Sequence, residues 1–267
     1  MNEMTGQCSG PGTTMNHLLF SALVFISVFG CALLGMYART RLPGHHVDED
    51  SATAIKLAAG LIATLAALVL GLLISSAKTT FDTVCQDFQH NAVNVLKLDR
   101  TLASYGPETS SLRASLKHKY GTWVDLIGSD DATNRHAIDS PAVLGHINDF
   151  QHELDALHPA NEDQRQLLPR AQEIFEEVFA VRWSALLQKH GSIPMALLVV
   201  LAAWLCVIFG TFGLFAPNNG TVLFFFFLCA LSSAGAIFVI TELDTPLGGM
   251  IRVPVAPMRA ALGQLGH

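Results

Sequence analysis

The sequence predicts an all-α membrane protein, with four transmembrane helices in two pairs that flank a helical extramembrane domain. Three segments carry this prediction, because Gly191–Thr241, His17–Ala38 and Leu57–Ala77 contain no Lys, Arg, Asp or Glu. A bilayer core of about 30 Å is crossed by about 20 apolar residues in an α-helix. The longest segment therefore holds two spans and each of the others holds one. The hydrophobic content of 51% is high for a soluble domain and is concentrated in these segments.

The first pair of spans occupies residues 17–77. Gly10-Pro11-Gly12 predicts that residues 1–16 form a flexible tail, which has no Lys or Arg of the kind that opens a cleaved signal peptide. We therefore interpret residues 17–38 as a retained span. Arg39 and Arg41 end this span, a short loop at 39–56 follows, and the second span covers 57–77.

Residues 78–190 form a polar stretch of domain size. The helix of the second span is expected to continue into it, because apolar residues recur at alternating spacings of four and three. This heptad-like seam contains Phe81, Cys85, Phe88, Ala92, Val95 and Leu102. Tyr105-Gly106-Pro107 ends the helix, with Gly as its cap and Pro opening the next one. Further helices are predicted over 107–127, from Pro141, and over 160–188.

The second pair of spans is a hairpin over residues 191–241, with helices at 193–215 and 221–241. The polar turn Ala216-Pro217-Asn218-Asn219-Gly220 separates them, and a C-terminal tail covers 242–267. With four spans, both termini and the middle domain lie on one side of the membrane. Basic residues near the membrane are more numerous on that side, so the positive-inside rule predicts that the middle domain is cytoplasmic.

The second span carries a stripe of small residues at steps of three and four: Gly60, Thr64, Ala67, Gly71 and Ser75. Small residues allow membrane helices to approach closely, which is one interpretation of the stripe. In the other, the stripe faces the central pore of an oligomer, with Leu68, Leu72 and Leu73 forming an apolar neck that gates by dewetting. The two interpretations are compatible if several copies of this helix surround one axis.

Several function classes are disfavoured by what the sequence lacks. None of the four spans contains a Lys, Arg, Asp or Glu in its interior, whereas proton relays and ion-coupled transporters depend on such groups. The net charge of −6 argues against a nucleic-acid partner. The histidines and cysteines match no metal-site spacing, and there is no phosphate-binding loop or nucleophile elbow. We therefore expect no catalytic residue, no metal site, no cofactor and no enzyme.

Two places in the sequence hold candidate ion contacts: Asp99 with Arg100, and Glu242 with Asp244. Asp99, beside Arg100, interrupts the apolar seam, which suits either a residue at a frayed helix end, an ion pair that sets helix register, or a buried ion contact. Glu242 and Asp244 follow the fourth span directly. Solvated carboxylates, or a pair with a basic residue such as Arg252, are the simpler interpretation, and oxygen ligands for calcium are the alternative.

Three motifs resemble the bacterial bestrophin-like membrane proteins: residues 98–108 (LDRTLASYGPE), 212–218 (FGLFAPN) and the stretch from Glu242 through Arg252. The resemblance implies a multi-pass protein of the bacterial inner membrane, related to bestrophins. Those are pentameric anion channels with four spans per subunit, a pore lined by the second span and, in animal members, a calcium clasp after the fourth. This chain departs from them, because its second span has no Phe, Tyr or Trp and its two acids after span four are too few for a full clasp.

Two hypotheses follow from different functional classes. The first is a homo-oligomeric ion channel that conducts an anion such as chloride, in contact with the lipid bilayer and with the second span around the pore. The second is a non-conducting membrane scaffold or sensor, in which the heptad-like seam transmits the state of the cytoplasmic domain to a partner.

Overall fold

A computed structural model describes residues 12–41, 49–129, 141–187, 193–246 and 250–266. Within these ranges all regular structure is helical, so the predicted all-α fold is confirmed. The chain divides into two compact units. The first combines Met1–Thr80 with Gly191–Ile251, and the second combines Phe81–His190 with Arg252–His267.

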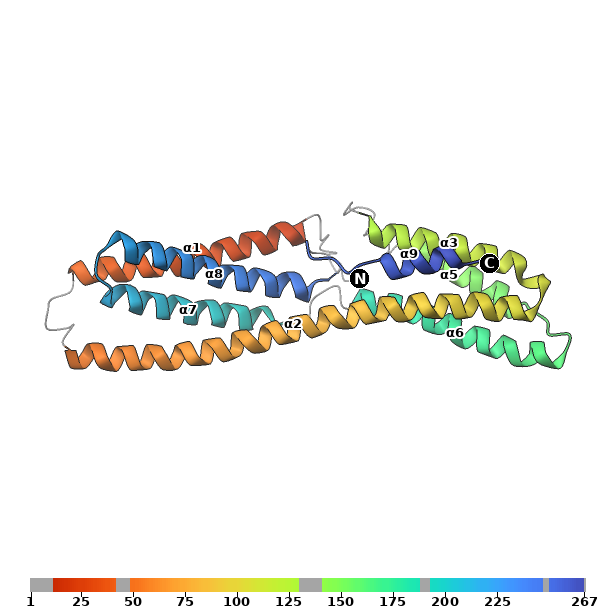
Figure 1. The fold of residues 1–267 in the computed structure, drawn as a ribbon, viewed down its shortest axis with the longest axis horizontal. Coiled ribbons are helices and arrows are strands. Elements are labelled where there is room, and N and C mark those ends of the chain that lie inside the picture. The colour runs from red at the N-terminus through yellow and green to blue at the C-terminus, as the bar shows by residue number, and fades with distance from the viewer. Residues whose placement is uncertain (1–11, 42–48, 130–140, 188–192, 247–249, 267) are drawn as a thin grey trace, which may run out of the picture. The chain divides into compact units, whose positions relative to one another are not determined.

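The first unit contains four helices that are long and apolar enough to cross a membrane. They are α1 (Gly12–Arg41), the N-terminal part of α2 (Glu49–Tyr105), α7 (Met195–Phe215) and α8 (Gly220–Asp244), all visible in Figure 1. Two side-chain layers hold them together. One is the apolar cluster that includes Val28, Ala66, Leu201 and Ile237, one residue from each helix.

Glycine lets α1 and α7 approach each other more closely than larger residues would permit. A Cβ atom on Gly35 would fall against the carbonyl oxygen of Gly210, and one on Gly213 would fall against the carbonyl oxygen of Ala32. Aromatic rings form the second side-chain layer of this unit. The ring of Phe227 lies edge-on to the rings of both Phe25 and Phe29. Small residues and interlocking rings replace the hydrophobic effect, which does not drive helix association in lipid.

Polar contacts close both ends of this bundle. At one end, the Arg39 guanidinium donates to the carbonyl oxygens of Phe215 and Ala216, where a basic side chain meets the unpaired carbonyls of a helix C-terminus. At the other end, the Ile193 backbone N–H donates to the Asp244 carboxylate over 3.1 Å. The start of the α7 segment is thereby held beside the end of α8, as an antiparallel hairpin requires.

The second unit begins within α2, and all regular structure over its described residues is helical. Gly106 ends α2 with a φ of 147°, a conformation that L side chains rarely adopt, and Pro107 then opens the short 3₁₀ helix η2 (Pro107–Thr109). The remaining helices are α3 (Ser110–Gly128), α5 (Pro141–Asp155), α6 (Glu162–Leu187) and α9 (Ala256–Gln264). Their core contains buried apolar side chains from α2, α3, α5, α6 and α9, among them Leu98, Leu116, Leu154, Phe175 and Met258.

Helix ends differ from the expected boundaries at several places. The first helix begins at Gly12, inside the expected tail 1–16, and α2 begins at Glu49, inside the expected loop 39–56. In the C-terminal stretch 242–267, α8 continues to Asp244 and α9 forms a separate helix. Hydropathy locates the apolar part of a helix, whereas polar turns extend beyond it wherever backbone hydrogen bonding and local contacts favour the helix.

Substitutions of glycine by alanine should separate the packed glycines from the open ones. Gly213→Ala should lower the free energy of unfolding by about 1–3 kcal/mol, because the added methyl group overlaps the backbone of α1. Gly60→Ala is the matched control, since nothing lies within 4 Å of its Cβ position, and alanine is the better helix former. Thermal unfolding in detergent measures both variants. Equal melting temperatures would contradict the packing described here.

Candidate functional site

The predicted pore-lining residues lie together on one exposed face of α2. Gly60, Thr64, Ala67, Leu68, Gly71, Leu72 and Ser75 are all exposed in the single chain, and Leu68 and Leu72 each expose 62% of their surface. The opposite face of the helix is buried among α1, α7 and α8, through Ala66, Leu73 and Ala77. Leu73, expected beside the neck, is therefore a core residue that is only 6% exposed.

The small residues of this face do not serve packing within the chain. A Cβ atom on Gly60 or Gly71 would meet nothing within 4 Å, in contrast to the glycines between α1 and α7. The Thr64 hydroxyl donates to the Leu61 carbonyl oxygen of its own helix over 2.8 Å. At these two glycines no described part of the chain packs against the face, and the face carries no Lys, Arg, Asp or Glu.

Asp99 lies in the core of the second unit, where it is 2% exposed. The Arg113 guanidinium of α3 donates to both of its carboxylate oxygens, from Nε over 2.8 Å and from Nη2 over 2.9 Å. This hydrogen bond raises the pKa of the Arg113 guanidinium above its ordinary value. The partner of Asp99 is therefore Arg113, whereas the neighbouring Arg100 is exposed. Since α2 continues to Tyr105, Asp99 does not lie at a frayed helix end.

The Asp99 carboxylate also binds the segment that follows α9. The Gly266 backbone N–H donates to Asp99 over 3.2 Å, and the Lys117 ammonium donates to the Leu265 carbonyl oxygen over 2.8 Å. A buried carboxylate that accepts three N–H donors is well compensated for the loss of water. Asp99 consequently joins α2, α3 and the segment after α9.

A second buried polar contact in this unit escaped the sequence analysis. Asn91 donates from its side-chain amide to the Val178 carbonyl oxygen over 2.6 Å, and its amide oxygen accepts the Tyr120 hydroxyl over 3.1 Å. Burial raises the pKa of the Tyr120 phenol well above its ordinary value. The only signal in the sequence was a polar residue among the apolar residues of α2.

Glu242, expected in solvent or paired with Arg252, is fully buried at the end of α8. One carboxylate oxygen lies 3.3 Å from the His17 Nδ1 atom, and the other accepts the backbone N–H groups of Met250 and Ile251. Asp244 is 7% exposed and accepts the Ile193 N–H. His17 was not among the predicted site residues, because a single histidine before a span carries no spacing signal.

These carboxylates do not fit a calcium clasp. Calcium takes six to eight oxygen ligands, as a rule with several carboxylates converging on it. Both oxygens of Glu242 instead face nitrogen atoms, and Asp244 accepts a backbone N–H. Among the residues that the structure describes, no group of three or more His, Cys, Asp or Glu side chains is arranged to hold a metal ion.

Breaking the Asp99–Arg113 pair should loosen the C-terminal segment. Asp99→Asn should lower the free energy of unfolding by about 1.5–3 kcal/mol, since the partly buried guanidinium loses its charged partner. Arg165→Met is the matched control, because its pair with Glu162 is exposed and is worth less than about 1 kcal/mol. Thermal unfolding and the rate of proteolysis within 252–266 measure the effect. Unchanged proteolysis in Asp99→Asn would show that the carboxylate does not hold this segment.

The family model described as the bestrophin-like domain matches residues 26–258 of the chain. No curated protein matches the chain. A crystal structure of a bacterial bestrophin homologue from Klebsiella pneumoniae, carrying a point mutation, superimposes with a TM-score of 0.59 at 13% identity. That match covers 92% of this chain and 99% of the homologue, and it shows a shared fold. The chain, a multi-pass membrane protein with four apolar helices, belongs to the bestrophin-like domain family.

Proposed function

We propose that the chain is one subunit of a homo-oligomeric ion channel in the bacterial inner membrane, with the exposed face of α2 lining the pore. The observation that carries this proposal is the open space at Gly60 and Gly71. In a membrane helix, small residues normally permit close packing, yet no described part of this chain lies within 4 Å of the Cβ positions of these two glycines. A pore formed by copies of α2 around one axis accounts for a face that is small, uncharged and unused within the subunit.

The chemistry of this face suits passive conduction. Leu68 and Leu72 are the large apolar side chains on it, and a ring of such residues makes a constriction that gates by dewetting. No Lys, Arg, Asp or Glu lies between Leu57 and Ala77, so the proposed pore has no proton relay or coupling-ion site. Chloride is the proposed permeant ion and a pentamer the proposed assembly, both by analogy with bestrophins.

Scaffolding through the α2 seam has less support. Four of the six predicted seam residues, Phe88, Ala92, Val95 and Leu102, are buried within the second unit, and Phe81 and Cys85 are partly buried. A seam that already packs within its own subunit requires no partner helix. We therefore favour conduction, and place no catalytic activity in the chain.

Substitution at Gly71 tests the channel directly. Gly71→Phe should remove most of the chloride current of the purified protein in planar bilayers, because the ring would enter the proposed neck. Gly235→Phe is the matched control on α8, since its Cβ position is equally open and it lies on a helix assigned no pore role. Equal currents in the two variants would exclude α2 as the pore helix. A monomer in both detergent and bilayers would overturn the whole proposal.

Cysteine labelling tests the proposed orientation. In a chain whose five native cysteines are replaced, a cysteine at Thr40 should react with a membrane-impermeant maleimide added to spheroplasts. A cysteine at Ser104, exposed on the second unit, should react only after lysis, because the middle domain is proposed to be cytoplasmic. The reverse pattern would place that domain outside the cell.

A further inference from the structure

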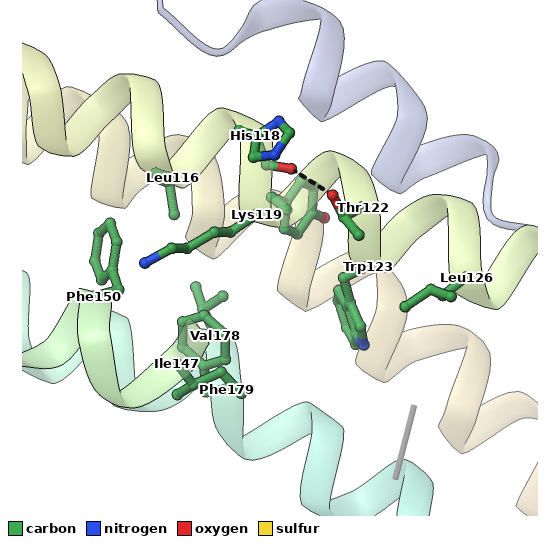
Figure 2. A pocket seen from close by; sticks show the side chains of 11 residues that line it. Leu116, His118, Lys119, Thr122, Trp123, Leu126, Ile147, Phe150, Val178 and Phe179 are labelled. Carbon is green, nitrogen blue, oxygen red and sulfur yellow. Dashed lines mark hydrogen bonds between the residues drawn. The ribbon is translucent and has the colours of Figure 1, made fainter. Parts of the chain in front are cut away.

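The second unit contains an apolar cavity of about 260 Å³ between α3, α5 and α6. Its walls are formed by large apolar and aromatic side chains, with Leu116 and Trp123 from α3, Ile147 and Phe150 from α5, and Val178 and Phe179 from α6. Figure 2 shows these side chains around the cavity, with the Lys119 side chain reaching toward Phe150. Small-molecule sites in proteins have this character, since they are apolar with a few placed polar groups.

Lys119 brings a positive charge to this cavity. Its ammonium lies 5.7 Å from the centre of the Phe150 ring, and its side chain is partly buried. Among the described residues no carboxylate pairs with it. A cation beside an aromatic face is stabilised, but less completely than a cation that is paired with an anion. The site thus favours a negatively charged group on whatever enters it.

Trp123 also lines the cavity. Its indole Nε1–H is buried and has no acceptor among the described residues. This nitrogen has no surface open to the cavity, so it does not serve as a donor to a bound molecule. Of the other polar groups of the wall, the Tyr120 hydroxyl donates to Asn91 and the Thr122 hydroxyl donates to the His118 carbonyl oxygen. The His118 side chain also lines the cavity. The Lys119 ammonium therefore provides the permanent charge of this wall.

We propose that this cavity binds a small amphiphilic carboxylic acid, with its chain or ring among the apolar walls and its carboxylate beside Lys119. An engineered apolar cavity of about 150 Å³ binds benzene, so the volume here suits a single ring or a short alkyl chain. The proposal concerns a site in the extramembrane unit and does not depend on ion conduction.

Two ligands of the same chemistry distinguish the sources of such an acid. Decanoate represents a fatty acid released from the membrane, and phenylacetate represents a soluble aromatic acid. Isothermal titration of the full chain in nanodiscs should show saturable binding of at least one of them, after subtraction of partitioning into empty nanodiscs. Decanol and phenylethanol, which lack the charge, should bind at least about tenfold more weakly.

Substitutions then assign the binding to the cavity. Lys119→Met should weaken binding of the acid about tenfold and leave binding of the alcohol unchanged, because only the charged contact is lost. Lys97→Met is the matched control, since Lys97 is exposed on α2 outside the cavity. If Lys119→Met fails to fold, as judged by its melting temperature, Lys119→Gln serves in its place.

Three outcomes would overturn the proposal. One is the absence of saturable binding for both acids, and another is equal affinity in wild type and the Lys119 variant. The third is binding to dissociated subunits but not to the oligomer, which would show that a neighbouring subunit occupies the cavity.

Discussion

The structure depends on the division of α2 into two faces. One face of its membrane part is committed to the apolar cluster of the first unit, through Ala66, Leu73 and Ala77. The same helix then contributes Phe88, Val95 and Leu102 to the core of the second unit. Buried positions recur about every seven residues along α2. One continuous helix can therefore contribute to both cores while the other face of its membrane part stays exposed. The proposal for the pore rests on the face of α2 that remains exposed outside these two cores.

Buried carboxylates organise the ends of both units. Asp99 and Glu242 are withdrawn from water, and each accepts hydrogen bonds from N–H groups outside its own helix. Moving a charged carboxylate out of water costs free energy unless hydrogen-bond donors of the protein replace the lost water. The N–H groups that bind Asp99 and Glu242 provide this replacement. We therefore interpret these two carboxylates as groups that stabilise the fold rather than as ligands for a permeating or sensing ion.

The sequence predicted the fold well and the site contacts poorly, for a physical reason. Four spans and the end of α2 at Gly106 follow from composition, periodicity and the conformational preferences of Gly and Pro, which are local properties. The seam was correct at Phe88, Val95 and Leu102, whereas Val84 is buried more deeply than the predicted Phe81 or Cys85. The partners of Asp99 and Glu242 could not be foreseen, because Arg113, His17 and Gly266 reach them only through tertiary folding. The openness of Gly60 and Gly71 likewise depends on where the other three helices lie.

The contact between Glu242 and residues 250–251 has a consequence for how this part of the chain can vary. The carboxylate recognises backbone N–H groups, while the side chains of Met250 and Ile251 are 65% and 37% exposed. Most residue types therefore satisfy the contact at these two positions, and proline, which has no N–H, does not. What the contact fixes is the number of residues between Glu242 and its donors. In this stretch the fold constrains chain length more strictly than amino-acid identity.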